Sequence, residues 1–131
     1  MSIATAPAPT GLRQLALTFR DVPAATAFYR DVLGVPLTFE TDGMAFFELG
    51  GVRLMFTRPS APEFDHPNSV LYLAVTDAAQ AYTTAVARGA TPERPAGSVG
   101  RTATHEIVIG FVRDPEGNLV GLAEDRLLAP S

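Results

Sequence analysis

Residues 15–34, LALTFRDVPAATAFYRDVLG, decide the fold of this chain, because residues 71–90, LYLAVTDAAQAYTTAVARGA, repeat their pattern. Each stretch opens with alternating apolar residues, continues through an aspartate into a helical pattern of apolar residues, and closes with a glycine. Alternation is typical of a strand, and apolar residues three and four apart are typical of an amphipathic helix. The repeat therefore predicts two copies of one structural module.

The start and end of each helix can be predicted from its flanking residues. Asp21 and Asp77 stand where a side chain accepts a hydrogen bond from the first helical turn, and Pro23 is tolerated in such a turn. Gly34 and Gly89 end the two helices. The predicted buried stripes are Ala25, Phe28, Tyr29, Val32 and Leu33 in the first helix, and Ala78, Ala81, Tyr82 and Ala85 in the second.

Strand patterns follow each helix. They cover residues 36–40, 44–49 and 52–57 in the first half, and part of 91–99, then 107–112 and 119–123, in the second. The order βαβββ thus occurs twice, which predicts an α+β fold of tandem βαβββ modules. Periodicity alone leaves an ordinary α+β sandwich open. We expect a disordered tail (1–10) and a single domain (11–126), made of modules 11–59 and 68–126 and a Pro-rich linker, 60–67.

Composition excludes several classes of function. The chain of 131 residues has a net charge of −4 and no basic run, so we expect neither nucleic-acid nor membrane binding. It has no cysteine, which excludes disulfides and thiolate chemistry. Its first residues do not have the pattern of a signal peptide, and no apolar run approaches the roughly 20 residues that span a bilayer. A cytoplasmic location is the expectation.

A second motif lies near the end of the chain. In residues 111–125, FVRDPEGNLVGLAED, Asp-Pro and Gly-Asn predict a turn between two strands. Together with residues 14–34, this motif resembles the vicinal oxygen chelate superfamily, which includes glyoxalase I, extradiol dioxygenases and bleomycin-resistance proteins. The resemblance covers about residues 12–125. It implies two βαβββ modules that form a cupped mixed sheet, with the helices outside, the ligand inside and a homodimer as the assembly.

The resemblance also implies where a metal would bind. Enzymes of the superfamily hold one divalent metal at four strand positions, which fall here at Gln14, Met55, Val70 and Gly121. Only Gln14 offers an oxygen donor, whereas stable metal sites use about three or more protein ligands. We therefore expect no metal and no other cofactor.

Strand alternation predicts the residues that line the cup. With Gln14 facing inward, a mostly apolar pocket with a few polar groups is expected, as in many small-molecule sites. Gly121 would leave room for a bulkier ligand, although a glycine in a strand can also mark a bulge or a packing gap. The predicted ligand-binding residues are Gln14, Thr18, Arg53, Met55, Val70, Tyr72 and Gly121.

His105 is the candidate for a catalytic role. It follows a segment, residues 97–101, that the sequence predicts as a loop over the cup, and a histidine there can act as acid or base. A surface histidine bonded to its own loop is the alternative. Three functions stay open: metal-free binding of a small apolar or aromatic molecule, a metal-independent lyase or isomerase that uses His105, and a metal-dependent glyoxalase or dioxygenase with relocated ligands.

Overall fold

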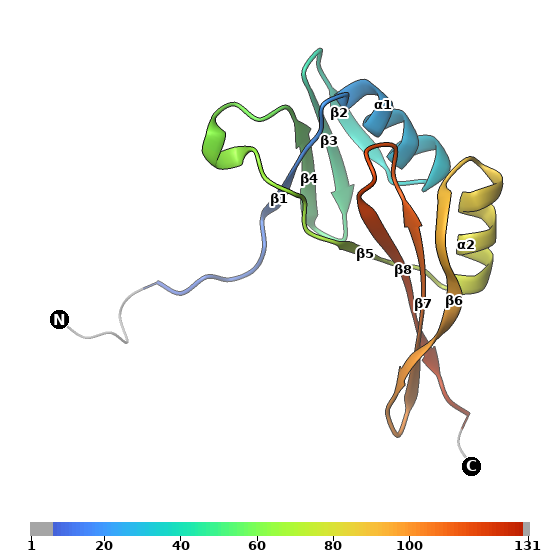
Figure 1. Cartoon of the computed structure of the whole chain (residues 1–131). Helices are drawn as coiled ribbons and strands as arrows, with labels where there is room; N and C mark the ends of the chain where they lie inside the picture. Colours follow the sequence, from blue (N-terminus) through green and yellow to red (C-terminus); the bar gives the residue numbers. More distant parts are fainter. Residues whose placement is uncertain (1–6, 130–131) are drawn as a thin grey trace.

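The computed structural model describes residues 7–129, and the βαβββ order is found twice (Figure 1). Residues 1–6 of the expected disordered tail lie outside the described part. The first module contains β1 (Gln14–Thr18), α1 (Val22–Ala27) with a π-helical continuation η2 (Phe28–Val32), β2 (Leu37–Glu40), β3 (Met44–Leu49) and β4 (Val52–Thr57). A 3-10 turn, η3 (Pro62–Phe64), lies in the linker.

The second module repeats this arrangement. It contains β5 (Leu71–Ala74), α2 (Ala78–Ala87), β6 (Thr91–Arg101), β7 (His105–Arg113) and β8 (Leu119–Leu127). The two four-stranded sheets have equivalent strand orders, β1-β4-β3-β2 and β5-β8-β7-β6. The pairs β1–β4 and β5–β8 are parallel and the other pairs are antiparallel. The predicted α+β fold of tandem modules with mixed sheets is confirmed.

Both predicted helix caps are present. Asp21 Oδ1 accepts a hydrogen bond from the Ala24 amide at 3.0 Å, and Asp77 Oδ1 accepts one from the Gln80 amide at 3.1 Å. Gly34 follows the first helical segment with a φ of 75°, a conformation that glycine adopts without a Cβ penalty. Local signals therefore place both helices where the sequence predicts them.

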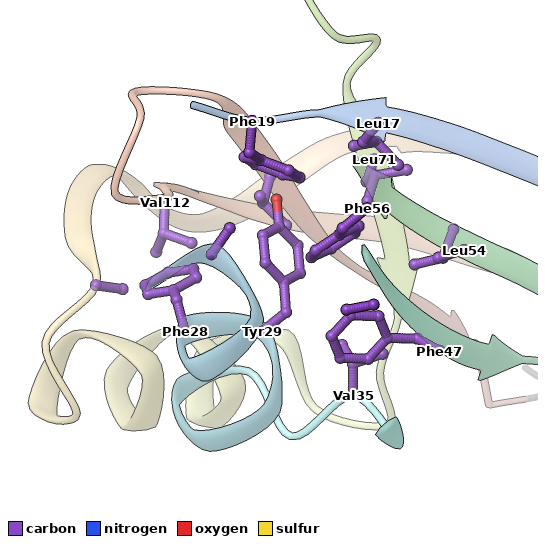
Figure 2. Packing of buried hydrophobic residues seen from close by; sticks show 14 of the residues in the cluster. Leu17, Phe19, Phe28, Tyr29, Val35, Phe47, Leu54, Phe56, Leu71 and Val112 are labelled. Carbon is purple, nitrogen blue, oxygen red and sulfur yellow. The ribbon is translucent and has the colours of Figure 1, made fainter. Parts of the chain in front are cut away.

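One apolar core extends beneath both helices and through both modules. Tyr29 lies at its centre, 1% exposed, with its ring among aromatic side chains (Figure 2). Its ring centroid lies 4.9 Å from that of Phe56 and 6.1 Å from that of Phe19, both in edge-on packing. Burial, together with the neighbouring Asp114 carboxylate, raises the pKa of the Tyr29 phenol well above its usual range, so the hydroxyl stays protonated and donates to Asp114 Oδ2 at 2.9 Å.

Polar contacts join the two modules at one end of β1. The Asn68 side chain accepts from the Thr18 amide at 3.0 Å and donates to the Thr18 carbonyl at 2.8 Å, which covers part of the open edge of this strand. Glu116 accepts from the amides of Arg20 and Asp21, both at 2.8 Å. Asn68, directly after the linker, and the β7–β8 turn thus hold the first module.

The structure differs from the sequence prediction in the region before β7. Residues 97–101 belong to β6 and are not a loop over the cup. Pairing with β7 draws this Gly-containing segment into the sheet, and register shifts between Pro92 and Arg94, Arg94 and Gly97, and Ser98 and Gly100 accommodate it. The β6–β7 hairpin projects away from the first sheet (Figure 1). Within residues 7–129, no helix is long and apolar enough to cross a membrane.

Candidate functional site

The faces of the two sheets that point away from the helices carry the predicted site residues. On β1 and β4, Leu17, Leu54 and Phe56 are buried in the core, whereas Gln14, Arg53 and Met55 alternate with them and are partly exposed. We name two surfaces. The first open face consists of Gln14, Phe39, Phe46, Glu48, Arg53 and Met55, and the second open face consists of Tyr72, Arg94, Phe111 and Gly121.

Arg53 is the central side chain of the first open face. Its Nε donates to Gln14 Oε1 at 2.8 Å, and its guanidinium carbon lies 5.4 Å from the centre of the Phe46 ring. The Gln14 amide nitrogen in turn lies 3.8 Å from the Met55 sulfur. The one amide oxygen that the sequence offers to a metal is therefore bonded to a guanidinium.

A hollow of about 470 Å³ lies beside Arg53. Phe39 is 58% exposed, and its ring centre lies 6.1 Å from that of Phe46. The hollow combines two aromatic rings with two cations and one carboxylate. It is lined by Arg13, Thr38, Phe39, Phe46, Glu48 and Arg53.

The second open face is an aromatic cluster. The Tyr72 ring packs edge-on against Phe111 with 5.8 Å between centres, and the Arg94 guanidinium carbon lies 5.2 Å from the Phe111 ring centre. A Cβ at Gly121 would lie only 2.6 Å from Tyr72 Cδ1. The prediction that Gly121 leaves room for a ligand is therefore wrong, because the ring of its cross-strand partner, Tyr72, fills that space.

The remaining predicted residues lie apart from these clusters. Thr18 is bonded to Asn68 at the junction of the modules, and Val70 is exposed just before β5. His105 begins β7, six residues from Phe111 and hence roughly 20 Å along the strand. Its Nδ1 is 2.8 Å from Thr104 Oγ1. Within one chain, His105 therefore lies far from the second open face, and its side chain is bonded to its own loop.

The aromatic part of the first open face is not among the site residues predicted from the sequence. Phe46 is the cross-strand partner of Met55, and Phe39 is the partner of Phe46. The alternation of β3 would have placed Phe46 on the same face as Met55 once the β3–β4 register was known. Phe39 gave no such signal, because the β2–β3 pairing contains a register shift.

The donor set at the four implied metal positions does not fit a divalent cation. Met55, Val70 and Gly121 supply no oxygen or nitrogen side-chain donor, and the Arg53 charge beside Gln14 would repel a cation. Elsewhere in residues 7–129, no three His, Cys, Asp or Glu side chains lie close enough to hold a metal ion.

Solved structures resemble this chain over nearly its whole length. An integron cassette protein from V. cholerae is 27% identical, with a TM-score of 0.72 over 91% of this chain and 98% of that one. A lactoylglutathione lyase from Agrobacterium tumefaciens is 25% identical, with a TM-score of 0.63 over 88% and 94%. A glyoxalase-related enzyme from Fulvimarina pelagi, 20% identical with a TM-score of 0.72 over 94% and 100%, shares the fold.

Sequence comparison assigns the family. No curated protein matches the chain. The family model described as Glyoxalase/Bleomycin resistance protein/Dioxygenase superfamily matches residues 11–122, which include the first βαβββ module, the second as far as the first half of β8, and both open faces. The chain therefore belongs to this superfamily, the vicinal oxygen chelate superfamily that its sequence motifs resemble.

Proposed function

We propose that this protein binds a small, largely apolar or aromatic molecule against the first open face, without a divalent metal. The observation that carries the proposal is the Arg53–Gln14 hydrogen bond of 2.8 Å, which puts a fixed guanidinium at an implied metal-ligand position. The exposed ring of Phe39 and the neighbouring ring of Phe46 supply apolar surface for such a ligand.

The proposal includes a homodimer that would cover exposed apolar side chains. Phe39 and Tyr72 are each 58% exposed, and large exposed apolar side chains are typical of interaction sites. A second copy would turn the one-sided first open face into one wall of a cup. Sedimentation at tens of micromolar checks this part, and a monomer at that concentration would contradict it.

Metal analysis and thermal unfolding together test the main proposal. Protein purified without chelator should contain no stoichiometric nickel, zinc or iron, and chelator should leave its melting temperature unchanged. Aromatic compounds that bind the folded state should raise the melting temperature by mass action. A stoichiometric metal whose removal lowers the melting temperature would support relocated metal ligands, the third function left open by the sequence, and would overturn the proposal.

A metal-independent lyase or isomerase is the second candidate. The observation in its favour is the 25% identity to a protein named as a lactoylglutathione lyase. His105 would act as acid or base in that case. His105 begins β7, next to the turn of the β6–β7 hairpin, and this hairpin projects away from the first sheet (Figure 1). A second copy would therefore have to bring His105 to the ligand. Turnover of a reactive carbonyl substrate that is lost in His105→Gln, with binding retained, would favour this candidate.

A further inference from the structure

We propose that the ligand of the first open face is an aromatic carboxylate, whose anionic group binds Arg53 and whose ring packs against Phe46 and Phe39. This inference rests on the proposed binding function and adds the chemical class of the ligand. It depends on three observations: the orientation of Arg53, the charges around the hollow, and the shape of its aromatic wall.

Arg53 is held in place and still has donors to offer. Its Nε is bonded to Gln14 and its guanidinium carbon lies over the Phe46 ring, so the side chain is held by two neighbours. Among the described residues, no carboxylate forms an ion pair with Arg53 or Arg13. The two Nη atoms of a guanidinium form a fork that matches the two oxygens of a carboxylate.

The hollow is positive although the protein is acidic. Arg13 and Arg53 line it with one carboxylate, Glu48, whereas the whole chain carries a net charge of −4. Glu48 is the cross-strand partner of Arg53, yet the two side chains form no ion pair within 4.0 Å. A neutral apolar ligand that covered Arg53 would remove its charge from water without compensation, which is costly. An anionic group on the ligand offsets that cost.

The aromatic wall selects a planar ligand. The rings of Phe39 and Phe46 both line the hollow, with centres 6.1 Å apart and planes inclined by 31°. Aromatic rings pack on one another in offset or edge-on arrangements. The hollow of about 470 Å³ lies within the size range of small-molecule sites, roughly 300–1,000 Å³, and can accept a two-ring aromatic acid.

The second open face provides a matched control. Arg94 lies 5.2 Å from the centre of the Phe111 ring, much as Arg53 lies 5.4 Å from that of Phe46. Arg94, however, has no hydrogen bond to a neighbouring side chain among the described residues, and the Tyr72 ring packs against Phe111. Arg94→Met thus removes an arginine with the same stacking geometry from outside the hollow.

The experiment compares 2-naphthoate with its neutral analogue 2-naphthamide by calorimetric titration of the full chain. The wild type should bind naphthoate at least about tenfold more tightly than the amide. Arg53→Met should weaken naphthoate binding by about ten- to a hundredfold, which is the usual effect of losing a hydrogen bond to a charged group. It should leave the affinity for 2-naphthamide unchanged. Arg53→Lys should recover part of the loss, and Arg94→Met should bind as the wild type does.

Each other outcome is informative, provided that amide correlation spectra show folded variants. Equal binding of acid and amide, unchanged in Arg53→Met, would overturn the carboxylate inference and leave the binding proposal standing. Equal losses in Arg53→Met and Arg94→Met would overturn the assignment to the first open face. If neither compound binds the wild type at millimolar concentration, this inference is overturned. The broader binding proposal is overturned only if other aromatic compounds fail to bind as well.

Discussion

The two open faces use the same strand pairing to build different surfaces. Phe46 on β3 pairs with Met55 on β4, and Phe111 on β7 pairs with Gly121 on β8. These pairs occupy equivalent places in the two modules, because β4 and β8 are the second strands of sheets with the same order. Two side chains differ: Met55 and Gly121 lie opposite the phenylalanines, and their partners on the neighbouring parallel strand are Ala16 and Tyr72.

These differences in side-chain volume decide which of the two faces keeps a hollow. In the first module, Met55 fills the position beneath Gln14, and the space beside Phe46 remains as a hollow. In the second, the missing side chain of Gly121 lets the Tyr72 ring settle against the strand and against Phe111. A duplicated scaffold thus carries a candidate binding site on one half and a closed aromatic cluster on the other.

The β-hairpin turns of the two modules differ as well. The β3–β4 turn is short and uses Gly50 and Gly51, with φ values of 53° and 85°. In the β7–β8 turn, the buried Asp114 accepts hydrogen bonds from the amides of Glu116 and Asn118, both at 2.9 Å, besides that from Tyr29. The β7–β8 turn is therefore stabilised by hydrogen bonds within itself, and the bond from Tyr29 to Asp114 anchors it to the first module.

The largest expected effect comes from breaking this anchor. Asp114→Ala leaves the buried Tyr29 hydroxyl and two turn amides without their acceptor, which should lower the free energy of unfolding by about 3 kcal/mol. Urea unfolding measures the change. Asp125→Ala removes an exposed carboxylate of β8 and should change stability by less than about 0.5 kcal/mol. Equal effects of the two substitutions would contradict the anchoring role.

A smaller effect tests why the second face is closed. Gly121→Ala places a Cβ 2.6 Å from Tyr72 Cδ1 and should destabilise the fold by about 1–3 kcal/mol through overpacking. In a Tyr72→Ala background the same substitution should cost much less, because the ring is gone. Gly100→Ala, with no heavy atom within 4 Å of the added Cβ, is the control. A cost that is equal in both backgrounds would show that Tyr72 does not fill this position.

Sequence predicted the parts of the molecule that depend on neighbouring residues. The caps at Asp21 and Asp77 and the turn at residues 114–118 are determined within a few positions, and the structure has them as expected. The closed second face needed the pairing of Tyr72 with Gly121, which lie far apart in sequence. Likewise, β6 extends through residues 97–101 because it pairs with β7, although local propensity favours a loop there.

The helix starts provide the last and smallest difference between the modules. At α1, Glu116 accepts from the amides of Arg20 and Asp21. At α2, Glu124 accepts from the Ala78 amide at 2.9 Å and is only 8% exposed, and its other oxygen lies 3.1 Å from Arg126 Nε. The carboxylate at the start of α2, Glu124, thus combines a backbone hydrogen bond with an ion pair.

Acid should therefore weaken the second helix start through Glu124. The hydrogen bond from Arg126, and secondly that from the Ala78 amide, hold the pKa of Glu124 below its ordinary value of 4.5. A carboxyl whose pKa is lowered by folding stabilises the fold above its unfolded pKa, and this contribution is lost as the pH falls through the folded value.

Wild type should then be more stable than Glu124→Gln at neutral pH, and the difference should shrink below about pH 4.5. Thermal unfolding from about pH 3 to pH 7 measures it, with Glu63→Gln in the exposed linker as the control that should show no difference. A gap between wild type and Glu124→Gln that stays constant over this range would mean that folding does not lower the pKa of Glu124, and that its charge beside Arg126 does not stabilise the start of α2.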